Sequence, residues 1–229
     1  KVLKISNKIV MEGPYKGVKF NVQSHWSNFD FSSKLIGIYE RAVQEKIVDL
    51  KSTYQLDNLI NIGAGEVYHL VSLIKKNYFK TATAYEIDKK GQEYLKDNLN
   101  LNEIKTEIKI FGKGDFESIK NEFDNTILKN TLFLIDIEGD EYELFDETNI
   151  KKYKKSFFVI EDHIFYDYKN KRDYFYGLIK KNFKISLLHN SARNPFNFEI
   201  LNEFNDDDKW LLMGEGRPKS MNWIILTPW

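Results

Sequence analysis

The chain has 229 residues, of which 42% are hydrophobic and 15% aromatic, and its 34 lysines and arginines are balanced by 34 aspartates and glutamates. This length and composition favour one α/β domain with a substantial core and exclude a mostly disordered chain. The zero net charge argues against a dedicated nucleic-acid binder, and the absence of cysteine excludes disulfides, thiol nucleophiles and cysteine metal sites.

The cellular setting is predicted from composition alone. No apolar run is long enough to span a membrane, and no secretory signal is seen at Lys1. A chain without cysteine also fits a reducing compartment, so a cytoplasmic location is expected. The bias towards Lys, Asn, Ile and Phe indicates an AT-rich genome. We expect the source to be a microbe, and specifically a bacterium.

Residues 1–50 are predicted to form an N-terminal cap on a main domain of residues 51–229. Apolar and polar residues alternate from Lys1 to about Val22, with a break at Gly13-Pro14, which predicts a β-hairpin. From about Phe31 to Leu50 the apolar residues take helical spacing, which predicts an amphipathic helix. Two interpretations stay open: this segment covers the mouth of a ligand site, or it only packs on a sheet.

A strand–helix alternation begins at Leu59. The predicted strands are Leu59–Ile62, Thr81–Glu86, Glu107–Phe111, Thr131–Ile137, Ser156–Glu161, Lys184–Leu188 and Trp223–Thr227, and helices are predicted at Val67–Lys76, Lys90–Leu99 and Asp173–Lys181. Such alternation implies parallel strands joined by right-handed crossovers. Because the strand interiors are apolar on both faces, we expect a doubly wound, Rossmann-like α/β sheet covered by helices on both sides.

Polar residues follow these strands at the points where they end. The first predicted strand runs into the glycine turn Gly63-Ala64-Gly65-Glu66, and the second ends in Glu86. Doubly wound sheets bind ligands at the carboxyl ends of their strands, and an acid about twenty residues beyond such a turn accepts hydrogen bonds from ribose hydroxyls. Asp115, after the third strand, is either a ligand contact or only the N-cap of a helix that begins at Phe116.

These residues resemble the class I S-adenosylmethionine-dependent methyltransferases, and among them the FkbM-type group. The matching segments are Asn61–Glu66, the acid Glu86 and the block Asp136-Ile137-Glu138-Gly139-Asp140-Glu141, with Leu35–Glu40, Glu215–Pro218 and Trp223 as further matches. The likeness covers most of the chain from about Gly13. It departs at Glu66-Val67, where many relatives have another glycine, and at Asp140, where FkbM-type enzymes usually have alanine.

The resemblance implies a sheet of seven strands with the last strand antiparallel, and S-adenosylmethionine as the cofactor. The implied cofactor site consists of Asn61, Gly63, Ala64, Gly65, Glu66, Glu86, Ile87, Asp115, Phe116 and Asp136. Within it, the glycine turn would lie under the methionine part and ribose, Glu86 on the ribose hydroxyls, and Asp115 and Phe116 near the adenine. Asp136 would face the amino group of the cofactor or the acceptor.

Methyl transfer from a sulfonium needs alignment and exclusion of water, and an alcohol acceptor must also lose a proton. His163, which follows the fifth strand, and Asp136 are the candidate catalytic residues, with His163 favoured as the base because its ordinary pKa lies near neutrality. The alternative is that His163 only packs in its loop. The acceptor is expected to contact Glu138, Asp162, His189, Arg193 and Arg217.

A divalent metal is not expected as a cofactor, although Asp136, Glu138, Glu161, Asp162 and His163 form an alternative set of oxygen and imidazole ligands. The favoured function is methylation of a hydroxyl group on a small molecule, sugar or glycan, without a nucleic-acid partner. Two other functions stay open: an NAD-dependent oxidoreductase, although Tyr68 stands where a third glycine would be required, and a non-catalytic nucleotide-binding module.

Overall fold

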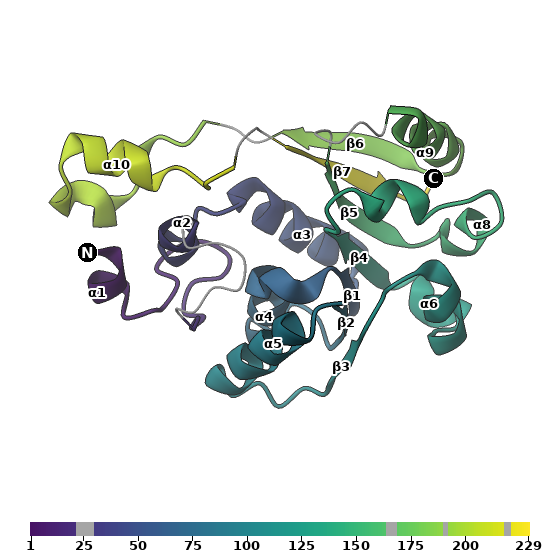
Figure 1. Cartoon of the computed structure of the whole chain (residues 1–229), viewed down its shortest axis with the longest axis horizontal. Coiled ribbons are helices and arrows are strands. Elements are labelled where there is room, and N and C mark those ends of the chain that lie inside the picture. The colour runs from purple at the N-terminus through teal and green to yellow at the C-terminus, as the bar shows by residue number, and fades with distance from the viewer. Residues whose placement is uncertain (22–29, 164–168, 190–191, 218–220) are drawn as a thin grey trace.

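The computed structural model describes residues 1–21, 30–163, 169–189, 192–217 and 221–229. Seven strands form one sheet in the order β3-β2-β1-β4-β5-β7-β6 (Figure 1). The strands are β1 (Asn58–Ile62), β2 (Thr81–Tyr85), β3 (Ile108–Phe111), β4 (Thr131–Ile135), β5 (Phe157–Asp162), β6 (Lys184–His189) and β7 (Asn222–Thr227). β7 lies between β5 and β6 and runs antiparallel to both, whereas the other strands share one direction. The predicted seven-stranded, mostly parallel α/β sheet is confirmed.

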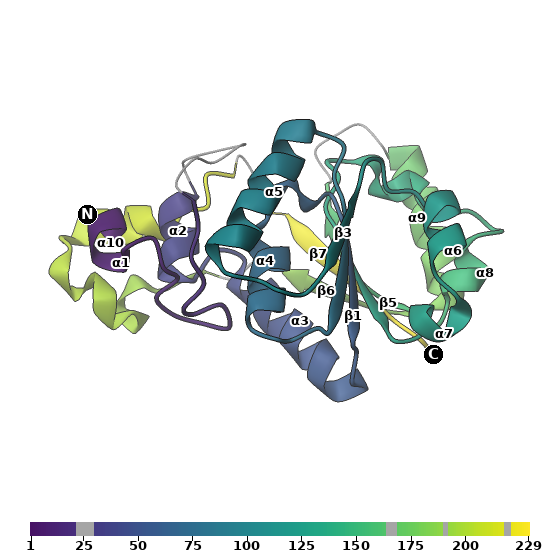
Figure 2. The same cartoon turned by 90° about the horizontal axis from the view of Figure 1, so that it is seen from below.

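Helices cover the sheet on both faces (Figure 2). One face carries α3 (Arg41–Tyr54), α4 (Tyr68–Lys75) and α5 (Lys89–Leu101). The other face carries α6 (Phe116–Glu122), α7 (Asn125–Leu128), α8 (Ile150–Tyr153) and α9 (Lys169–Asn182).

The side-chain alternation of the strands explains this three-layer arrangement. Leu132 and Leu134 of β4 belong to the core under α3–α5, whereas Phe133 and Ile135 belong to the core on the opposite face. Because successive residues of a strand point to opposite faces, an entirely apolar strand buries both faces and must be covered twice. The second core is rich in aromatic rings, for example Phe133 and Phe158, which stack with centroids 4.8 Å apart.

The N-terminal segment differs from its prediction as a hairpin. Residues Val2–Ser6 form a short helix, α1. Around the turn at Gly13, an antiparallel bridge joins Ile9 to Lys19, and backbone hydrogen bonds join Val10 to Val18 and Lys8 to Phe20. The apolar run at the start of the chain is too short for its spacing to distinguish helix from strand. Tertiary packing decides instead, since α1 lies beside α2 (Phe31–Ile36) in both views (Figures 1 and 2).

The single helix predicted between Phe31 and Leu50 is in fact two helices, α2 and α3. Gly37 ends α2 with a φ of +93°, and its N–H bonds back to the carbonyls of Ser33 and Lys34. A Cβ at Gly37 would lie 2.1 Å from the backbone oxygen of Glu12, so only glycine fits there. The break turns the chain so that Glu40 opens α3.

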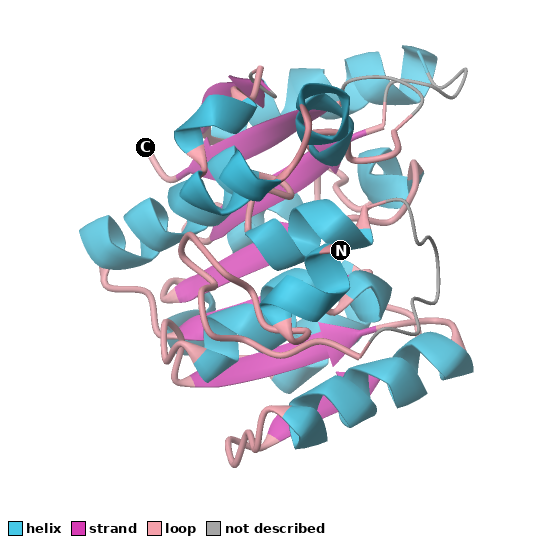
Figure 3. Cartoon of the chain, turned by 90° about the vertical axis from the view of Figure 1, so that its left-hand side faces the viewer, coloured by secondary structure: helices cyan, strands magenta, loops and turns pink. Residues whose placement is uncertain are grey.

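A lobe that combines N-terminal elements with the segment before β7 stands beside the main layers. It contains α1, α2, the short turns η3 (Pro195–Asn197) and η4 (Glu199–Glu203), and α10 (Asp206–Leu212) (Figures 1 and 3). The ammonium of Lys1 donates to the carbonyl of Glu203 and lies 4.3 Å from the ring centroid of Phe204. The region predicted as a cap therefore also includes residues from the C-terminal third of the chain.

Candidate cofactor and active site

A cavity of about 490 Å³ opens at the carboxyl ends of the first four strands. Its walls come from the segments after β1 (Gly63 and Gly65), β2 (Glu86 and Ile87), β3 (Gly112–Asp115) and β4 (Asp136–Glu138). The strand order reverses between β1 and β4, which is where doubly wound sheets bind their ligands. Most of the residues predicted to bind the cofactor are thus brought together in one pocket.

The glycine turn after β1 is required by the backbone that surrounds it. Gly63 has a φ of +83°, and a Cβ there would lie 1.7 Å from the backbone oxygen of Asp136. The Gly63 N–H also donates to the carbonyl of Tyr85 over 2.9 Å. A side chain is therefore excluded at Gly63 because the ends of two neighbouring strands approach each other closely there. This approach joins the turn to the segment that carries Asp136.

Val67, directly after the glycine turn, adopts the left-handed conformation. Its φ is +48° and its side chain is buried. A β-branched residue in this region is strained by about 1–3 kcal/mol, so the surrounding fold must hold it there. Of the other turn residues, Ala64 is buried outside the cavity lining, and the side chain of Glu66 lies outside the described part of the structure.

Glu86 is fixed at the end of β2 with one oxygen engaged. It is 5% exposed, and its Oε1 accepts a 2.7 Å hydrogen bond from the N–H of Asp88, which caps α5. Within the described parts of the chain, Oε2 of Glu86 has no hydrogen-bond partner. A Cβ at Gly91 would lie 3.0 Å from Cγ of Glu86, so this glycine leaves room for the acid.

Asp115 has the position that each of its two alternative roles requires, since it lines the cavity and also caps α6. Its carboxylate accepts hydrogen bonds from the N–H and the hydroxyl of Ser118, both 2.8 Å long, and these bonds lower the pKa of Asp115. Phe116 behaves differently from its prediction. It is 2% exposed, stacks on Tyr153 with centroids 4.3 Å apart, and is not among the residues that line the cavity.

The side chain of Asn61 forms its hydrogen bond within the sheet. Its side-chain amide donates to the carbonyl of Leu134 over 3.3 Å, and it is 4% exposed. Ile87, in contrast, lines the cavity and is 77% exposed.

An acidic cluster surrounds His163 at the edge of the cavity. Nε2 of His163 lies 3.6 Å from Oδ1 of Asp136, 3.5 Å from Oε2 of Glu138 and 3.5 Å from Oε2 of Glu161. Asp136 and Glu138 line the cavity, whereas the His163 side chain is only 1% exposed. We call these four residues the His163 cluster.

Glu141 holds the imidazole of His163 from the other side. Its Oε1 accepts hydrogen bonds from Nδ1 of His163 over 2.8 Å and from the His163 backbone N–H over 3.1 Å, and its Oε2 accepts from the N–H of Gly139. Burial would lower the pKa of His163, but the hydrogen bond and charge of Glu141 and the charges of Asp136 and Glu138 raise it. Burial and the Asp136 carboxylate raise the pKa of Glu161 well above its ordinary value.

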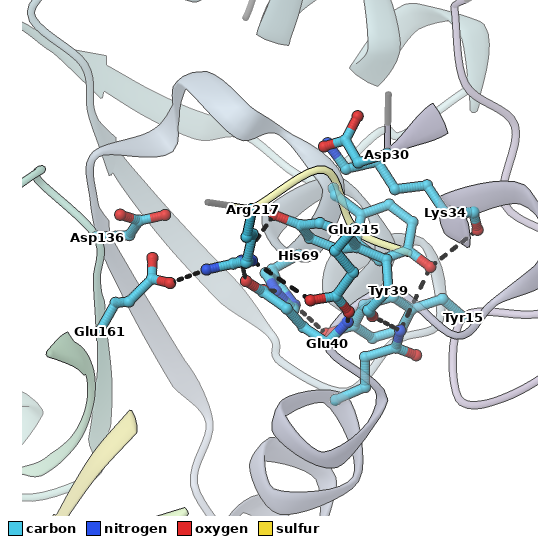
Figure 4. Close-up of polar contacts among 12 residues, drawn as sticks. Tyr15, Asp30, Lys34, Tyr39, Glu40, His69, Asp136, Glu161, Glu215 and Arg217 are labelled. Atoms are coloured by element: carbon cyan, nitrogen blue, oxygen red, sulfur yellow. Dashed lines mark hydrogen bonds and ion pairs between the residues drawn. The ribbon is translucent and has the colours of Figure 1, made fainter. Parts of the chain in front are cut away.

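Arg217 joins the His163 cluster to the N-terminal cap (Figure 4). Its guanidinium donates to Glu161 and to Glu40, and it also reaches the hydroxyl of Tyr39 at 3.1 Å and Oε2 of Glu215 at 3.3 Å. Glu40 and Glu161 are both 2% exposed, so one partly buried cation holds two buried carboxylates. Sheet, cap and C-terminal segment meet at this one side chain.

The same contacts continue into the cap. His69 donates from Nε2 to Oε2 of Glu40 over 2.6 Å and accepts at Nδ1 from the hydroxyl of Tyr15 over 2.8 Å. Tyr15 is fully buried. We call Tyr15, Glu40, His69, Glu215 and Arg217 the Arg217 network.

Three residues predicted to contact the acceptor are engaged elsewhere, and none lines the cavity. Asp162 is fully buried and accepts hydrogen bonds from Tyr142, Arg172 and Tyr176. His189 donates from Nδ1 to Oδ1 of Asn222 over 2.8 Å, and Arg193 pairs with Glu215. Asp162 and Glu161 are successive residues of β5, so their side chains point to opposite faces of the sheet.

The structure also reveals participants that the sequence did not indicate. Glu141 belongs to the acidic block of residues 136–141 but was predicted to have no role of its own. Glu215 belongs to the segment Glu215–Pro218, together with Arg217. For Glu40, His69 and Tyr15 no local signal exists, because their contacts span 29 to 177 residues of sequence.

Neither protein-family models nor curated protein sequences match this chain. Solved structures do. A Staphylococcus aureus protein assigned provisionally as a caffeoyl-CoA O-methyltransferase superposes with a TM-score of 0.53 at 14% identity, covering 90% of this chain and 95% of that one. A provisionally assigned Klebsiella pneumoniae O-methyltransferase gives 0.53 at 9% identity, covering 81% and 80%.

A third structure contains the cofactor. A Streptococcus pneumoniae protein assigned provisionally as a tRNA (m1A22) methyltransferase, in complex with S-adenosyl-L-methionine, gives a TM-score of 0.50 at 13% identity, covering 80% of this chain and 72% of that one. None of the helices that the structure describes is both long and apolar enough to cross a membrane. The chain therefore has the fold of the class I S-adenosylmethionine-dependent methyltransferases.

Proposed function

We propose that this protein is an S-adenosylmethionine-dependent methyltransferase that methylates a hydroxyl group of a small molecule, sugar or glycan. The observation that carries the proposal is the cavity at the switch point of the sheet, with Glu86 on one side and Asp136 on the other. The likeness to O-methyltransferase structures supports the same fold and the same position for the ligand.

The residues of the cavity fit the proposed cofactor. Glu86 has an oxygen available to accept from a ribose hydroxyl, and its rigid attachment to the start of α5 would position it without further ordering. Asp115 stands at the next strand end along the sheet edge, where the adenine is expected. When bound, S-adenosylmethionine supplies an electrophilic methyl group on a sulfonium centre. The protein has to align the acceptor and exclude water.

Proton removal from the acceptor is proposed to occur at Asp136. The Asp136 side chain is 23% exposed and lines the cavity, whereas the His163 side chain is 1% exposed and does not line it. Asp136 is therefore better placed than His163 to touch an acceptor hydroxyl. His163 is then a buried neighbour of the base, 3.6 Å from Asp136, and not the base itself.

Membership of the FkbM-type group is part of the proposal. The acidic block after β4 has a structural use that fits a shared motif: Asp136 and Glu138 line the cavity, Gly139 turns with a φ of +111°, and Glu141 holds His163. The acidic positions of the block thus line the cavity or support the site, and this includes the exposed Asp140, where the group usually has alanine.

A thermal-shift measurement on the full chain tests the proposal. S-adenosylhomocysteine should raise the midpoint of unfolding, because a ligand that binds only the folded state stabilises it, and NAD should not. Stabilisation by NAD would favour the oxidoreductase. An unchanged midpoint with both ligands would leave only the non-catalytic interpretation. Transfer of a labelled methyl group from S-adenosylmethionine to pooled glycans, hydroxylated metabolites or tRNA would then identify the acceptor class.

A further inference from the structure

The Nε2 atom of His163 is a buried nitrogen without a hydrogen-bond partner among the described residues. Three carboxylates surround it, from Asp136, Glu138 and Glu161. We infer that the His163 cluster binds a divalent transition-metal ion, held by Asp136, Glu161 and His163, with the more exposed Glu138 as a fourth ligand.

The spacing of these atoms suits a shared ion better than direct hydrogen bonds. At 3.5 and 3.6 Å, Nε2 is too far from each carboxylate oxygen for a good hydrogen bond. Two ligands on one ion with bonds of about 2.1 Å lie about 3.0–3.4 Å apart, depending on the coordination geometry. One donor atom each from Asp136, Glu161 and His163 lies within 4.8 Å of the others, so small side-chain shifts complete such a set.

Glu141 prepares His163 as a metal ligand. Because its carboxylate accepts from Nδ1, the neutral imidazole carries its proton there and has its lone pair on Nε2. That lone pair then faces the oxygens of three acids, an arrangement that is repulsive unless a metal ion or added protons lie between them. A carboxylate behind the distal nitrogen of a histidine is also the usual support of metal-binding imidazoles, since it fixes the ring and raises its basicity.

Arg217 orients the second buried ligand in the same way. It holds Oε1 of Glu161, which leaves Oε2 as the oxygen nearest to Nε2 of His163. Arg217 thus positions Glu161 through one carboxylate oxygen, and the other oxygen faces His163 (Figure 4 shows the Arg217–Glu161 pair). Both buried ligands, Glu161 and His163, have a partner that sets which atom they present.

The donor types favour Mn²⁺ over the alkaline-earth ions. Imidazole suits transition metals, whereas Mg²⁺ and Ca²⁺ prefer oxygen ligands only, and Mn²⁺ accepts both carboxylate and imidazole. Such binding needs neither the cofactor nor the acceptor, so this inference stands apart from the proposed function. Once Nε2 is engaged by an ion, His163 has no lone pair left to act as a base.

Titration of the chelator-treated full chain with Mn²⁺, followed by electron paramagnetic resonance of the free ion, tests the site. We expect one saturable Mn²⁺ per chain. His163→Gln should weaken binding at least about 100-fold because it removes a ligand, and Glu141→Gln about 10–100-fold because it removes only the support. Asp140→Asn is the matched control, since it removes an exposed acid of the same loop outside the His163 cluster.

Glu138→Gln tests whether a loss of Mn²⁺ binding could come from misfolding of the variant. Its side chain is 72% exposed, so this variant should fold normally, and we expect a loss of Mn²⁺ affinity smaller than that of His163→Gln. Equal affinity in wild type, His163→Gln and Glu138→Gln would overturn the inference, as would an equal loss in Asp140→Asn. No saturable Mn²⁺ binding in a chain that S-adenosylhomocysteine stabilises would reject the metal site alone. Mn²⁺ binding without a response to S-adenosylhomocysteine would reject only the proposed function.

Discussion

The two halves of the site are built in different ways. The proposed cofactor half, from Gly63 to Asp115, consists of short segments that each follow their own strand, and its two acids, Glu86 and Asp115, are held by neighbours close in sequence. The acceptor half joins Asp136 and His163 to Arg217 and Glu40, with contacts that span up to 177 residues. The first half is assembled as soon as the sheet forms, whereas the second requires both ends of the chain to be in place.

The largest effect expected from this difference is on stability. Arg217→Met should lower the free energy of unfolding by about 3–5 kcal/mol, because it leaves the buried carboxylates of Glu40 and Glu161 without their cation. Urea unfolding measures the loss. Lys171→Met is the control, since its ion pair with Glu143 is about half exposed and should contribute less than about 1 kcal/mol. Equal effects of both substitutions would show that the Arg217 network does not hold the two ends of the chain.

Glu86→Ala should weaken ligand binding in the cofactor half of the site and leave ligand binding in the other half unchanged. The affinity for S-adenosylhomocysteine should fall by about 10–100-fold, because a hydrogen bond to a charged group contributes about 1.5–3 kcal/mol. Mn²⁺ binding should stay unchanged. Calorimetry measures both, with Glu93→Ala on the exposed surface of α5 as the control. Unchanged affinity for S-adenosylhomocysteine would remove Glu86 from the ribose position.

Tyr15→Phe tests the far end of the Arg217 network. Loss of the hydroxyl leaves Nδ1 of His69 buried without this partner, which should cost about 1–2 kcal/mol of stability with no change in cofactor affinity. Tyr78→Phe is matched to it, because its hydroxyl also bonds to the N-terminal segment but is only half-buried. A fall in cofactor affinity in Tyr15→Phe would mean that the two halves are coupled.

The smallest effect concerns pH. The pKa of Asp115 is lowered in the folded chain, so its carboxylate stabilises the fold above its unfolded pKa, and this contribution is lost as the pH falls through the folded value. Asn caps helices as well as Asp does, so Asp115→Asn removes only the charge at the start of α6, worth about 0.3–1 kcal/mol. Urea unfolding from pH 7 down to about pH 3 should show the two proteins converging. A constant difference would show that the charge is not involved.

Much of the fold could be predicted from sequence because its signals are local. All seven strands lie within a few residues of the expected positions, since an apolar run flanked by turns indicates a buried strand wherever it occurs. The hairpin predicted for residues 1–22 is confirmed only around its turn, where residues 8–10 pair with 18–20, and was wrong for Val2–Ser6. The spacing of Val2, Leu3 and Ile5 fits helix and strand alike, and α1 depends on its contact with α2.

The sequence by itself determined the doubly wound sheet and the sheet edge at which the cofactor is proposed to bind, because a glycine turn, a strand-end acid and their spacing are properties of neighbouring residues. Only the tertiary structure decided which acids share a site. Asp162 and Glu161 are adjacent in sequence, yet one pairs with Arg172 and the other joins the His163 cluster. Phe116 likewise follows Asp115 directly but belongs to the aromatic core. Strand alternation and contacts across the whole chain separate such neighbours, and neither Arg217 nor Glu40 carries a local signal of its partner.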